Sequence, residues 1–337
     1  MLDATAIARI HEANRLQLLR GKDVKIIDRL DPTWLTGNLF NPANVPTLVI
    51  RGLRGLGDNI NQRAFLKELD FDFYLDTPWP ELYSDIPHAK LIPCATTLRT
   101  QNKNLARQPA GRFVEAPIDN YTLLNVSYGT RDLAVGSMYQ ALSRIFGGIR
   151  PKSFALPQFK FPQDKVEKHP KIAVIRPATV RKEWAAVSRN PSPEYLKQAS
   201  QILLEKGYYL ISIADLEENQ EWLLEPRPLA QLELHRGELN VEELIGLCRG
   251  ADLLVGGHGF ISHIALAEKV PAAIIMGGFF GDNRPATVAD PEFMDVSPIH
   301  FLLPDTPCMC TVMSHTACDK TISKFSEKFT TWLDGLE

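Results

Sequence analysis

Short apolar runs rich in β-branched residues alternate with helical segments along most of this chain, and this alternation constrains its fold more than any other feature. It occurs in two series, separated by residues 151–170, which carry four prolines and little helical periodicity. Strands that alternate with helices form parallel, doubly wound sheets. The sequence therefore predicts an α/β architecture of two Rossmann-like domains with parallel sheets that face a central cleft.

The two series set the expected domain boundaries. We expect an N-terminal extension over residues 1–45, to which the sequence assigns no role, then a first Rossmann-like domain over 46–155 and a linker over 156–170. A second Rossmann-like domain follows over 171–320 and a C-terminal helix over 321–337. Helices are expected near residues 4–20, 59–69, 132–146, 192–206, 241–248, 263–269 and 323–336. Strands are expected near 47–51, 71–75, 89–92, 171–175, 208–213, 251–255 and 272–276, and residues 24–44 are expected to form a short strand followed by a loop rich in proline and asparagine.

Composition limits the classes of partner and compartment. A net charge of −3 gives no global excess of basic residues that would indicate nucleic acid or an anionic membrane, although a local basic patch is compatible with it. The N-terminal residues lack the pattern of a signal peptide, and no apolar run approaches the ~20 residues that span a bilayer. We expect a cytoplasmic monomer, with peripheral membrane contact left open. The odd, unevenly spaced cysteines favour a reducing cytosol: Cys94, Cys248, Cys308, Cys310 and Cys318.

A glycine-rich turn follows the first strongly patterned strand, over residues 52–57, and leads into Asp58 at the start of a helix. Glycines let the backbone approach a ligand closely, and this edge of a parallel sheet is where such folds bind ligands. Asp58 could act there as a general base on an acceptor hydroxyl. It could equally be a helix N-cap. The glycine order is the reverse of a dinucleotide fingerprint, which disfavours NAD.

A basic loop follows the first strand of the second series. Its cations and hydroxyl could bind a pyrophosphate through charge-assisted hydrogen bonds. A solvated basic loop is the alternative, although an exposed loop rarely needs an indole. The candidate donor-binding residues are Arg176, Thr179, Arg181, Lys182 and Trp184.

A second glycine turn joins the strand near 251–255 to the following helix. The N-terminus of a helix after such a turn is ready to bind an anion. Either histidine of this turn could bond to phosphate or to sugar hydroxyls, and one of them, His263 by preference, could instead be structural. The candidates for donor binding are Gly257, His258, Gly259, Phe260, Ile261, Ser262 and His263.

The order of these motifs resembles glycosyltransferase family 9, the ADP-heptose:lipopolysaccharide heptosyltransferases. Residues 49–58 resemble that family's R-x-S-x-x-G-D signature, and residues 182–184 its K-x-W loop. Residues 243–256 are similar to its L-x-x-L-I-x-x-A-D-L-V-V-G segment, and residues 263–271 to its H-x-A-A-A-x-x-x-P segment. The similarity runs in the right order over roughly residues 46–280.

The resemblance implies a GT-B fold and an inverting, metal-independent sugar transfer from a nucleotide-diphosphate donor. It implies that Asp58 deprotonates the acceptor hydroxyl, and that Lys182, Thr179 and the backbone of residues 259–262 hold the nucleotide diphosphate. Such an enzyme positions two substrates and neutralises charge on the leaving diphosphate, and it needs no cofactor beyond the nucleotide sugar. His258 stands where the family has an aspartate that contacts the donor sugar. The resemblance therefore supports the fold better than it supports heptose.

A basic segment of the first domain is the candidate acceptor site. Acidic residues are absent between Asp85 and Glu115, whereas five basic ones fall there. Such a segment suits an anionic acceptor such as a lipopolysaccharide-core-like glycan or glycolipid. It would also suit DNA with hydroxymethylated bases, as in phage-type DNA modification, or it could be a solvated loop. The acceptor-binding candidates are Arg54, Asn61, Arg99, Lys103 and Arg107.

The C-terminal tail gathers Cys308, Cys310, His315 and Cys318. They could bind zinc, but a single residue between the first two cysteines is atypical of zinc knuckles. We interpret the cluster as structural and expect no metal. The leading hypothesis is a glycosyltransferase. The alternatives are an inactive GT-B protein that binds a glycan or nucleotide, which the presence of both Asp58 and Lys182 disfavours, and a nicotinamide-dependent oxidoreductase.

Overall fold

The computed structural model describes residues 23–32, 47–109, 111–183 and 185–336. The chain forms two compact units. Unit 1 comprises Met1–Tyr128 and Met138–Pro157, and unit 2 comprises Gly129–Ser137 and Gln158–Glu337. None of the helices in the described part is long and apolar enough to cross a membrane.

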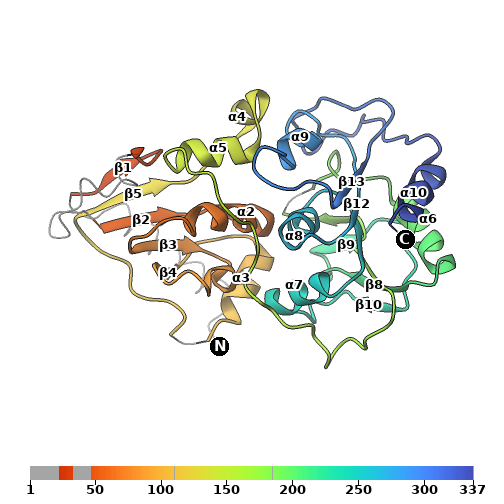
Figure 1. Ribbon diagram of the computed structural model, residues 1–337, viewed down its shortest axis with the longest axis horizontal. Coiled ribbons are helices and arrows are strands. Elements are labelled where there is room, and N and C mark those ends of the chain that lie inside the picture. The colour runs from red at the N-terminus through yellow and green to blue at the C-terminus, as the bar shows by residue number, and fades with distance from the viewer. Residues whose placement is uncertain (1–22, 33–46, 110, 184, 337) are drawn as a thin grey trace. The chain divides into compact units, whose positions relative to one another are not determined.

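Unit 1 is built on a five-stranded, wholly parallel sheet in the order β1-β5-β2-β3-β4 (Figure 1). Its middle strands are apolar on both faces because helices cover a parallel sheet, and Val49 and Leu123 are almost wholly buried. The strands are β1 (Lys25–Ile27), β2 (Thr47–Arg51), β3 (Phe73–Thr77), β4 (Ala89–Pro93) and β5 (Tyr121–Asn125), and the helical elements are α2 (Leu56–Leu66), η2 (Pro80–Tyr83), α3 (Arg99–Ala106) and α5 (Met138–Ile145).

Unit 2 has a six-stranded parallel sheet in the order β10-β8-β6-β11-β12-β13. Counted along the chain within this sheet, the order is 3-2-1-4-5-6, which characterises Rossmann-like folds. A separate two-stranded antiparallel sheet pairs β7 with β9. The strands are β6 (Ile172–Ile175), β7 (Thr179–Arg181), β8 (Tyr209–Ile213), β9 (Glu221–Leu223), β10 (Leu232–Leu234), β11 (Leu253–Gly256), β12 (Ala272–Ile275) and β13 (Ile299–Leu302).

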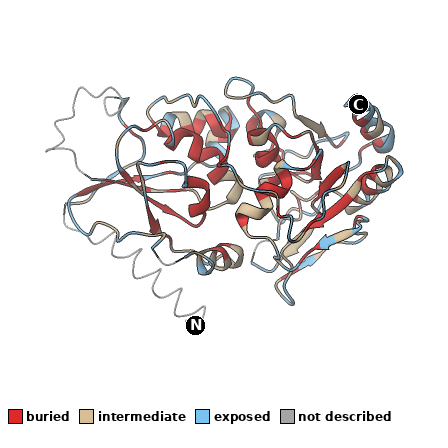
Figure 2. Ribbon diagram, turned by 60° about the horizontal axis from the view of Figure 1, so that its bottom comes forward, coloured by how far each residue is buried: buried red, intermediate tan, exposed pale blue. Residues whose placement is uncertain are grey.

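The helices of unit 2 bury the sheet. Figure 2 shows buried residues concentrated in the strands and in the helix faces against them. Phe325, Phe329 and Leu333 of the C-terminal helix pack with α6 over one face of the sheet, so this helix belongs to the core of unit 2. The helices are α4 (Thr130–Val135), α6 (Pro193–Glu205), α7 (Val241–Arg249), α8 (Phe260–Glu268), α9 (Pro285–Val288) and α10 (Phe325–Asp334).

Several predicted boundaries differ from the structure. The N-terminal extension supplies β1, which pairs with β5 in the first sheet; the helix expected over 4–20 lies outside the described residues. The single helix expected over 132–146 is wrong: extended backbone at Gly136 separates α4 from α5. The basic loop after β6 contains a strand, β7, because its backbone pairs with β9.

Candidate functional site

The order of strands in unit 1 fixes where a ligand can bind. In that sheet β2 lies between β5 and β3, all parallel. The chain leaves the carboxyl end of β2 toward α2, whereas the carboxyl end of β5 leads to residues 126–128. Doubly wound sheets bind ligands outside the carboxyl ends of two such neighbouring strands. Asp58 and Tyr128 follow these two strands.

The carboxylate of Asp58 is held by a tyrosine. Asp58 is half-buried in the first turn of α2, and its Oδ1 accepts a hydrogen bond from the Tyr128 hydroxyl. The N-cap position of α2 is Gly55, and it has no side-chain cap hydrogen bond. A Cβ atom at position 55 would collide with Oδ2 of Asp58, so glycine lets the carboxylate fold over the helix end. This geometry argues against a role for Asp58 as a simple N-cap.

Two buried amides shape the glycine turn that carries Asp58. The amide of Asn59 donates to the carbonyl oxygens of Leu53 and Gly55, at 2.6 and 2.9 Å. The Gln62 carbonyl oxygen accepts from the Leu53 N–H at 2.8 Å. The turn is therefore fixed by α2 itself. Sequence reasoning missed Tyr128, Asn59 and Gln62; only the buried register of α2 could have pointed to the two amides.

Two predicted acceptor residues have structural roles. Arg54 makes a bidentate ion pair with Asp76, at 2.8 and 2.9 Å, and this pair helps to raise the pKa of Arg54, although burial acts against it. Asn61 is buried, and its amide nitrogen lies 3.0 Å from Sδ of Met138 in α5. Asn61 is therefore buried inside unit 1 and Arg54 is ion-paired with Asp76, and contact of either residue with an acceptor stays a prediction.

The basic residues of α3 share one helix face. Arg99, Lys103 and Arg107 follow one another at four-residue intervals, the last at the C-cap position. The buried positions of α3 are Gln101 and Asn104, which face unit 1. Contact between the three cations and an acceptor stays a prediction.

Unit 2 has a topological switch point between β6 and β11, where the chain continues along the sheet in opposite directions on the two sides. These strands are parallel neighbours in the middle of the sheet, although β6 begins the unit and β11 lies far along the chain. Arg176 directly follows β6, and the second glycine turn, residues 257–259, directly follows β11 and leads into α8. The strand order therefore brings Arg176 to the N-terminus of α8, where backbone N–H groups lack helical partners.

The guanidinium of Arg176 is packed against that helix terminus. Its Nη1 lies 3.1 Å from where a Cβ of Gly259 would stand, and its Cζ lies 4.6 Å from the centre of the Phe260 ring. Within the described residues, no hydrogen bond or ion pair of this guanidinium is present. Burial, together with the nearby Arg181 and Arg189, lowers the pKa of Arg176 to about 10. A half-buried cation beside the positive end of a helix attracts an anion.

The two histidines at this helix terminus, His258 and His263, are both buried. His258 is buried, and its Nδ1 lies 2.9 Å from the Ser262 hydroxyl oxygen, which donates to the Gly259 carbonyl at 2.7 Å. This network favours an Nδ1–H donor and leaves Nε2 as an acceptor. Burial first, and then Arg189 and His263, push the pKa of His258 well below its usual value. A neutral His258 suits a sugar hydroxyl better than a phosphate. His263 and Ile261 are buried in α8.

The basic segment after β6 is organised by a buried glutamate. The Thr179 hydroxyl donates to Glu221 at 2.8 Å, and Arg181 makes an ion pair with Glu221 at 2.9 Å. Both side chains therefore hold β7 against β9, a role that sequence reasoning missed because Glu221 is distant in sequence. The Lys182 side chain is exposed. Trp184 lies outside the described residues.

The tail residues form a separate cluster in unit 2. One potential metal-ligand atom from each of Cys308, Cys310, His315 and Cys318 lies within 4.8 Å of the others. The sequence suggested this grouping, but not its compactness.

No protein-family model matches this sequence, and no curated protein is detectably similar to it. Solved structures are similar in fold. The iron-containing dodecameric glycosyltransferase TibC from enterotoxigenic E. coli H10407 aligns over 86% of this chain and 78% of its own, at a TM-score of 0.55 and 14% identity. A family 9 glycosyl transferase from Veillonella parvula DSM 2008 aligns over 86% and 97%, at 0.54 and 12%. E. coli ADP-heptose lps heptosyltransferase II aligns over 86% and 98%, at 0.50 and 12%. This chain therefore has the GT-B fold of the family 9 heptosyltransferases.

Proposed function

We propose that this protein is an inverting glycosyltransferase that moves a sugar from a nucleotide-diphosphate donor to a hydroxyl of an anionic acceptor. The observation that carries the proposal is the half-buried Arg176 guanidinium packed against Gly259 and Phe260 at the N-terminus of α8. Its position at the switch point of a Rossmann-like sheet suits the diphosphate of a nucleotide. A further support is the similar fold of TibC, whose structure has been solved with ADP-D-beta-D-heptose.

At the donor end, the protein would stabilise charge that develops on the leaving group. The bond from the anomeric carbon to the diphosphate oxygen breaks, and the nucleoside diphosphate departs with the electron pair. Arg176 and the backbone N–H groups at the N-terminus of α8 would neutralise that charge from a fixed position, without a metal ion. Lys182, whose side chain is exposed, would add a more weakly held contact to the phosphates.

At the acceptor end, Asp58 would serve as the base. As the acceptor oxygen bonds to the anomeric carbon, its proton passes to the Asp58 carboxylate. A single displacement of this kind inverts the anomeric configuration. Tyr128, which donates to Oδ1, would orient the carboxylate without touching the reacting atoms, and is therefore a positioning residue.

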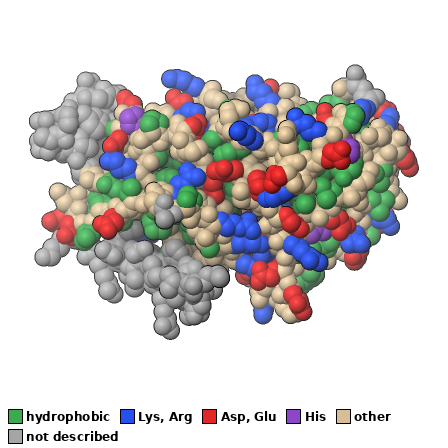
Figure 3. All heavy atoms as spheres, turned by 90° about the horizontal axis from the view of Figure 1, so that it is seen from below, with side chains coloured by type: hydrophobic (Ala, Val, Ile, Leu, Met, Phe, Trp, Pro, Cys, Tyr) green, Lys and Arg blue, Asp and Glu red, His purple; other side chains and the backbone are tan. Residues whose placement is uncertain are grey.

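The acceptor is proposed to be a lipopolysaccharide-core-like glycan. Arg99, Lys103 and Arg107 on one face of α3 support an anionic acceptor. Hydroxymethylated DNA stays the alternative acceptor, because its phosphates would also attract these cations. Figure 3 shows acidic and basic side chains interspersed on one face of the molecule. We expect the enzyme to act in the cytoplasm as a monomer; its five cysteines are unpaired, which suits a reducing compartment.

A thermal-shift screen tests the proposal. The full chain is melted with ADP-, UDP-, GDP- and CMP-sugars, with NAD and with free nucleotides. A donor at ~100 times its dissociation constant would add ~2.7 kcal/mol and raise the melting temperature measurably. A shift with one nucleotide-sugar class supports the proposal. A shift with NAD alone, or with none of the ligands, would contradict it.

A further inference from the structure

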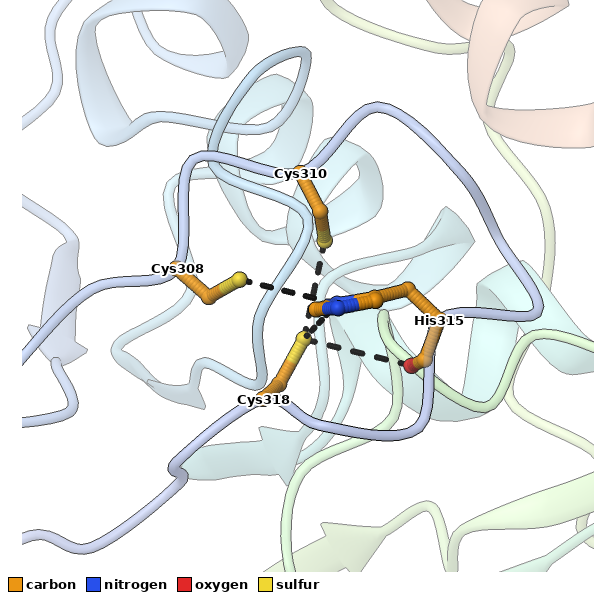
Figure 4. Close-up of side chains that lie close together, drawn as sticks. All are labelled: Cys308, Cys310, His315 and Cys318. Carbon is orange, nitrogen blue, oxygen red and sulfur yellow. Dashed lines mark hydrogen bonds between the residues drawn. The ribbon is translucent and has the colours of Figure 1, made fainter.

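The connection between β13 and α10 lacks regular structure. Residues 303–324 contain no helix or strand and bury few apolar side chains. Irregular connections longer than ~15 residues are uncommon in compact units unless they bind something or are fastened. Most side chains from Met309 to Ala317 are exposed, whereas Cys308, Cys310, His315 and Cys318 are half-buried. The four half-buried residues point toward one another, as Figure 4 shows.

We propose that Cys308, Cys310, His315 and Cys318 bind one zinc ion that fastens this connection to the body of unit 2. Three thiolates and an imidazole are a common ligand set of structural zinc sites. They leave no open coordination position, so the ion has a structural and not a catalytic role. The ligands come from one short stretch of chain, which zinc can close into a loop.

The distances within the cluster fit tetrahedral zinc. With Zn–S of about 2.3 Å and Zn–N of about 2.0–2.1 Å, the edges of the tetrahedron measure about 3.8 Å between sulfurs and about 3.6 Å between sulfur and nitrogen. The Sγ atoms of Cys310 and Cys318 lie 3.5 Å apart. Nδ1 of His315 lies 3.6 Å from Sγ of Cys308 and 3.2 Å from Sγ of Cys318. Small outward shifts would complete the site.

A disulfide is the competing use of these sulfurs. A bonded pair lies about 2.05 Å apart, whereas Cys310 and Cys318 are separated by 3.5 Å and all five cysteines are free. A disulfide would also leave the inward-pointing Nδ1 of His315 and the Cys308 thiol unused. The geometry therefore favours one ion shared by four ligands.

The loop after β12 supplies the surroundings that metal thiolates require. The Phe279 N–H donates to Sγ of Cys310 at 3.3 Å. A Cβ atom at position 278 would collide with Sγ of Cys318, so glycine is needed there. Backbone N–H groups that donate to ligand sulfurs orient them and offset their negative charge. The loop after β12 thus contacts the sulfurs of Cys310 and Cys318 from outside the cluster.

The same connection braces the donor site. Ser188 donates from its N–H to the Met313 carbonyl at 3.0 Å and from its hydroxyl to the Val312 carbonyl at 2.9 Å. The adjacent Arg189 donates to the His258 carbonyl at 3.2 Å. Zinc would therefore stiffen the segment that supports the second glycine turn, as binding to the folded state stabilises a structure.

Elemental analysis tests the site directly. The full chain, purified without metal-affinity resin from medium that contains zinc and iron, is analysed by mass spectrometry for metals. We expect one zinc per chain, lost in Cys310→Ala and Cys318→Ala and retained in the matched controls Cys94→Ala and Met309→Ala. A chain without metal, or Cys310→Ala with unchanged zinc, would overturn the site. One iron per chain, which sulfur-rich tetrahedral sites also accept, would overturn the choice of zinc.

Cobalt substitution keeps the test decisive if the alanine variants fail to fold. Wild-type protein loaded with Co²⁺ should show the sulfur-to-cobalt charge-transfer band and the intense visible bands of a tetrahedral site. Cys308→His, which replaces one ligand by another, should retain the metal with altered bands. Weak octahedral bands, or an intact-protein mass two protons lower because of a disulfide, would contradict the proposal. None of these readouts depends on transferase activity.

Discussion

The two switch points of this molecule share an architecture and differ in charge. In unit 1 a glycine turn after β2 presents the Asp58 carboxylate at the N-terminus of α2, and in unit 2 a glycine turn after β11 meets the Arg176 guanidinium at the N-terminus of α8. A carboxylate is stabilised by the positive end of a helix, whereas a guanidinium is not. The helix end in unit 1 therefore stabilises the charged group beside it. The helix end in unit 2 lies beside a group of like sign, and we expect a bound anion to relieve that repulsion. The fold therefore determines where a ligand can bind, and the side chains at that position determine which charge it should carry.

Replacing the carboxylate should have the largest effect. We expect Asp58→Asn to lower transfer by about 10²–10⁴-fold, the range for loss of a general base. Donor affinity should stay nearly intact, because we propose that the donor binds to unit 2. Single-turnover transfer and calorimetry measure the two quantities. Asp70→Asn, an exposed aspartate of unit 1, is the control. Equal loss of transfer and of donor affinity would sink the assignment of Asp58 as the base.

Removing the tyrosine hydroxyl should have a smaller effect on the same site. Tyr128→Phe deletes a hydrogen bond to a charged group, a contact of about 1.5–3 kcal/mol. If Tyr128 orients Asp58, kcat should fall on the order of 10-fold while KM for the donor is unchanged. Steady-state kinetics of the variant and the wild type measure kcat and the donor KM separately. A rise in donor KM with constant kcat would show that Tyr128 does not act through Asp58.

The neutral His258 gives unit 2 a dependence on pH. Its folded-state pKa is depressed by burial and by Arg189. Because the unfolded chain then binds more protons, His258 makes stability fall as pH drops below about 6.5, by at most ~1.4 kcal/mol per pH unit. Urea unfolding between pH 7 and 5.5 should show this loss. His258→Gln should reduce the slope without removing it, because burial also lowers the pKa of His235 and His300. An unchanged slope would argue that His258 has the same pKa in the folded and the unfolded chain, and so would contradict its burial as a neutral group.

The smallest effect is expected at Lys182. Its side chain is exposed, so a contact with phosphate would be screened by water and worth about 1 kcal/mol or less. We expect Lys182→Ala to weaken donor binding a few-fold in calorimetry, an effect that shrinks as salt is raised. A loss insensitive to salt would indicate that Lys182 is buried against the donor in the complex.

Much of the fold was predictable because local pattern determines it. The strand before each glycine turn, the position of Asp58 and the helix after residue 192 all follow from apolar runs with glycine or proline beside them. Strand β5, whose carboxyl end forms part of the first switch point, was missed, although Asp119 and Asn120 form a bend directly before it. Without β5, the pairing of Asp58 with Tyr128 could not be predicted.

The parts of the site that sequence reasoning missed depend on contacts between distant residues. Arg181 pairs with Glu221, and Arg54 with Asp76, and neither partner is marked by a motif. Sequence reasoning therefore assigned Arg54 and Arg181 to ligands, although nearby carboxylates already hold them. In the sequence, nothing distinguishes Arg176 from the other basic residues of the loop that follows β6. Only the neighbouring position of β6 and β11 distinguishes it.

Calorimetry on Arg176→Gln tests the central claim most directly, with Arg227→Gln, an exposed arginine of unit 2, as the matched control. The account predicts that Arg176→Gln weakens binding of the nucleotide-sugar by about 1.5–3 kcal/mol. It also predicts that the unliganded protein is at least as stable to urea as the wild type, because the substitution removes a half-buried cation that has no hydrogen bond or ion pair within the described residues and lies at the positive end of a helix. Unchanged donor affinity, or a loss of affinity matched by a loss of unliganded stability, would contradict it.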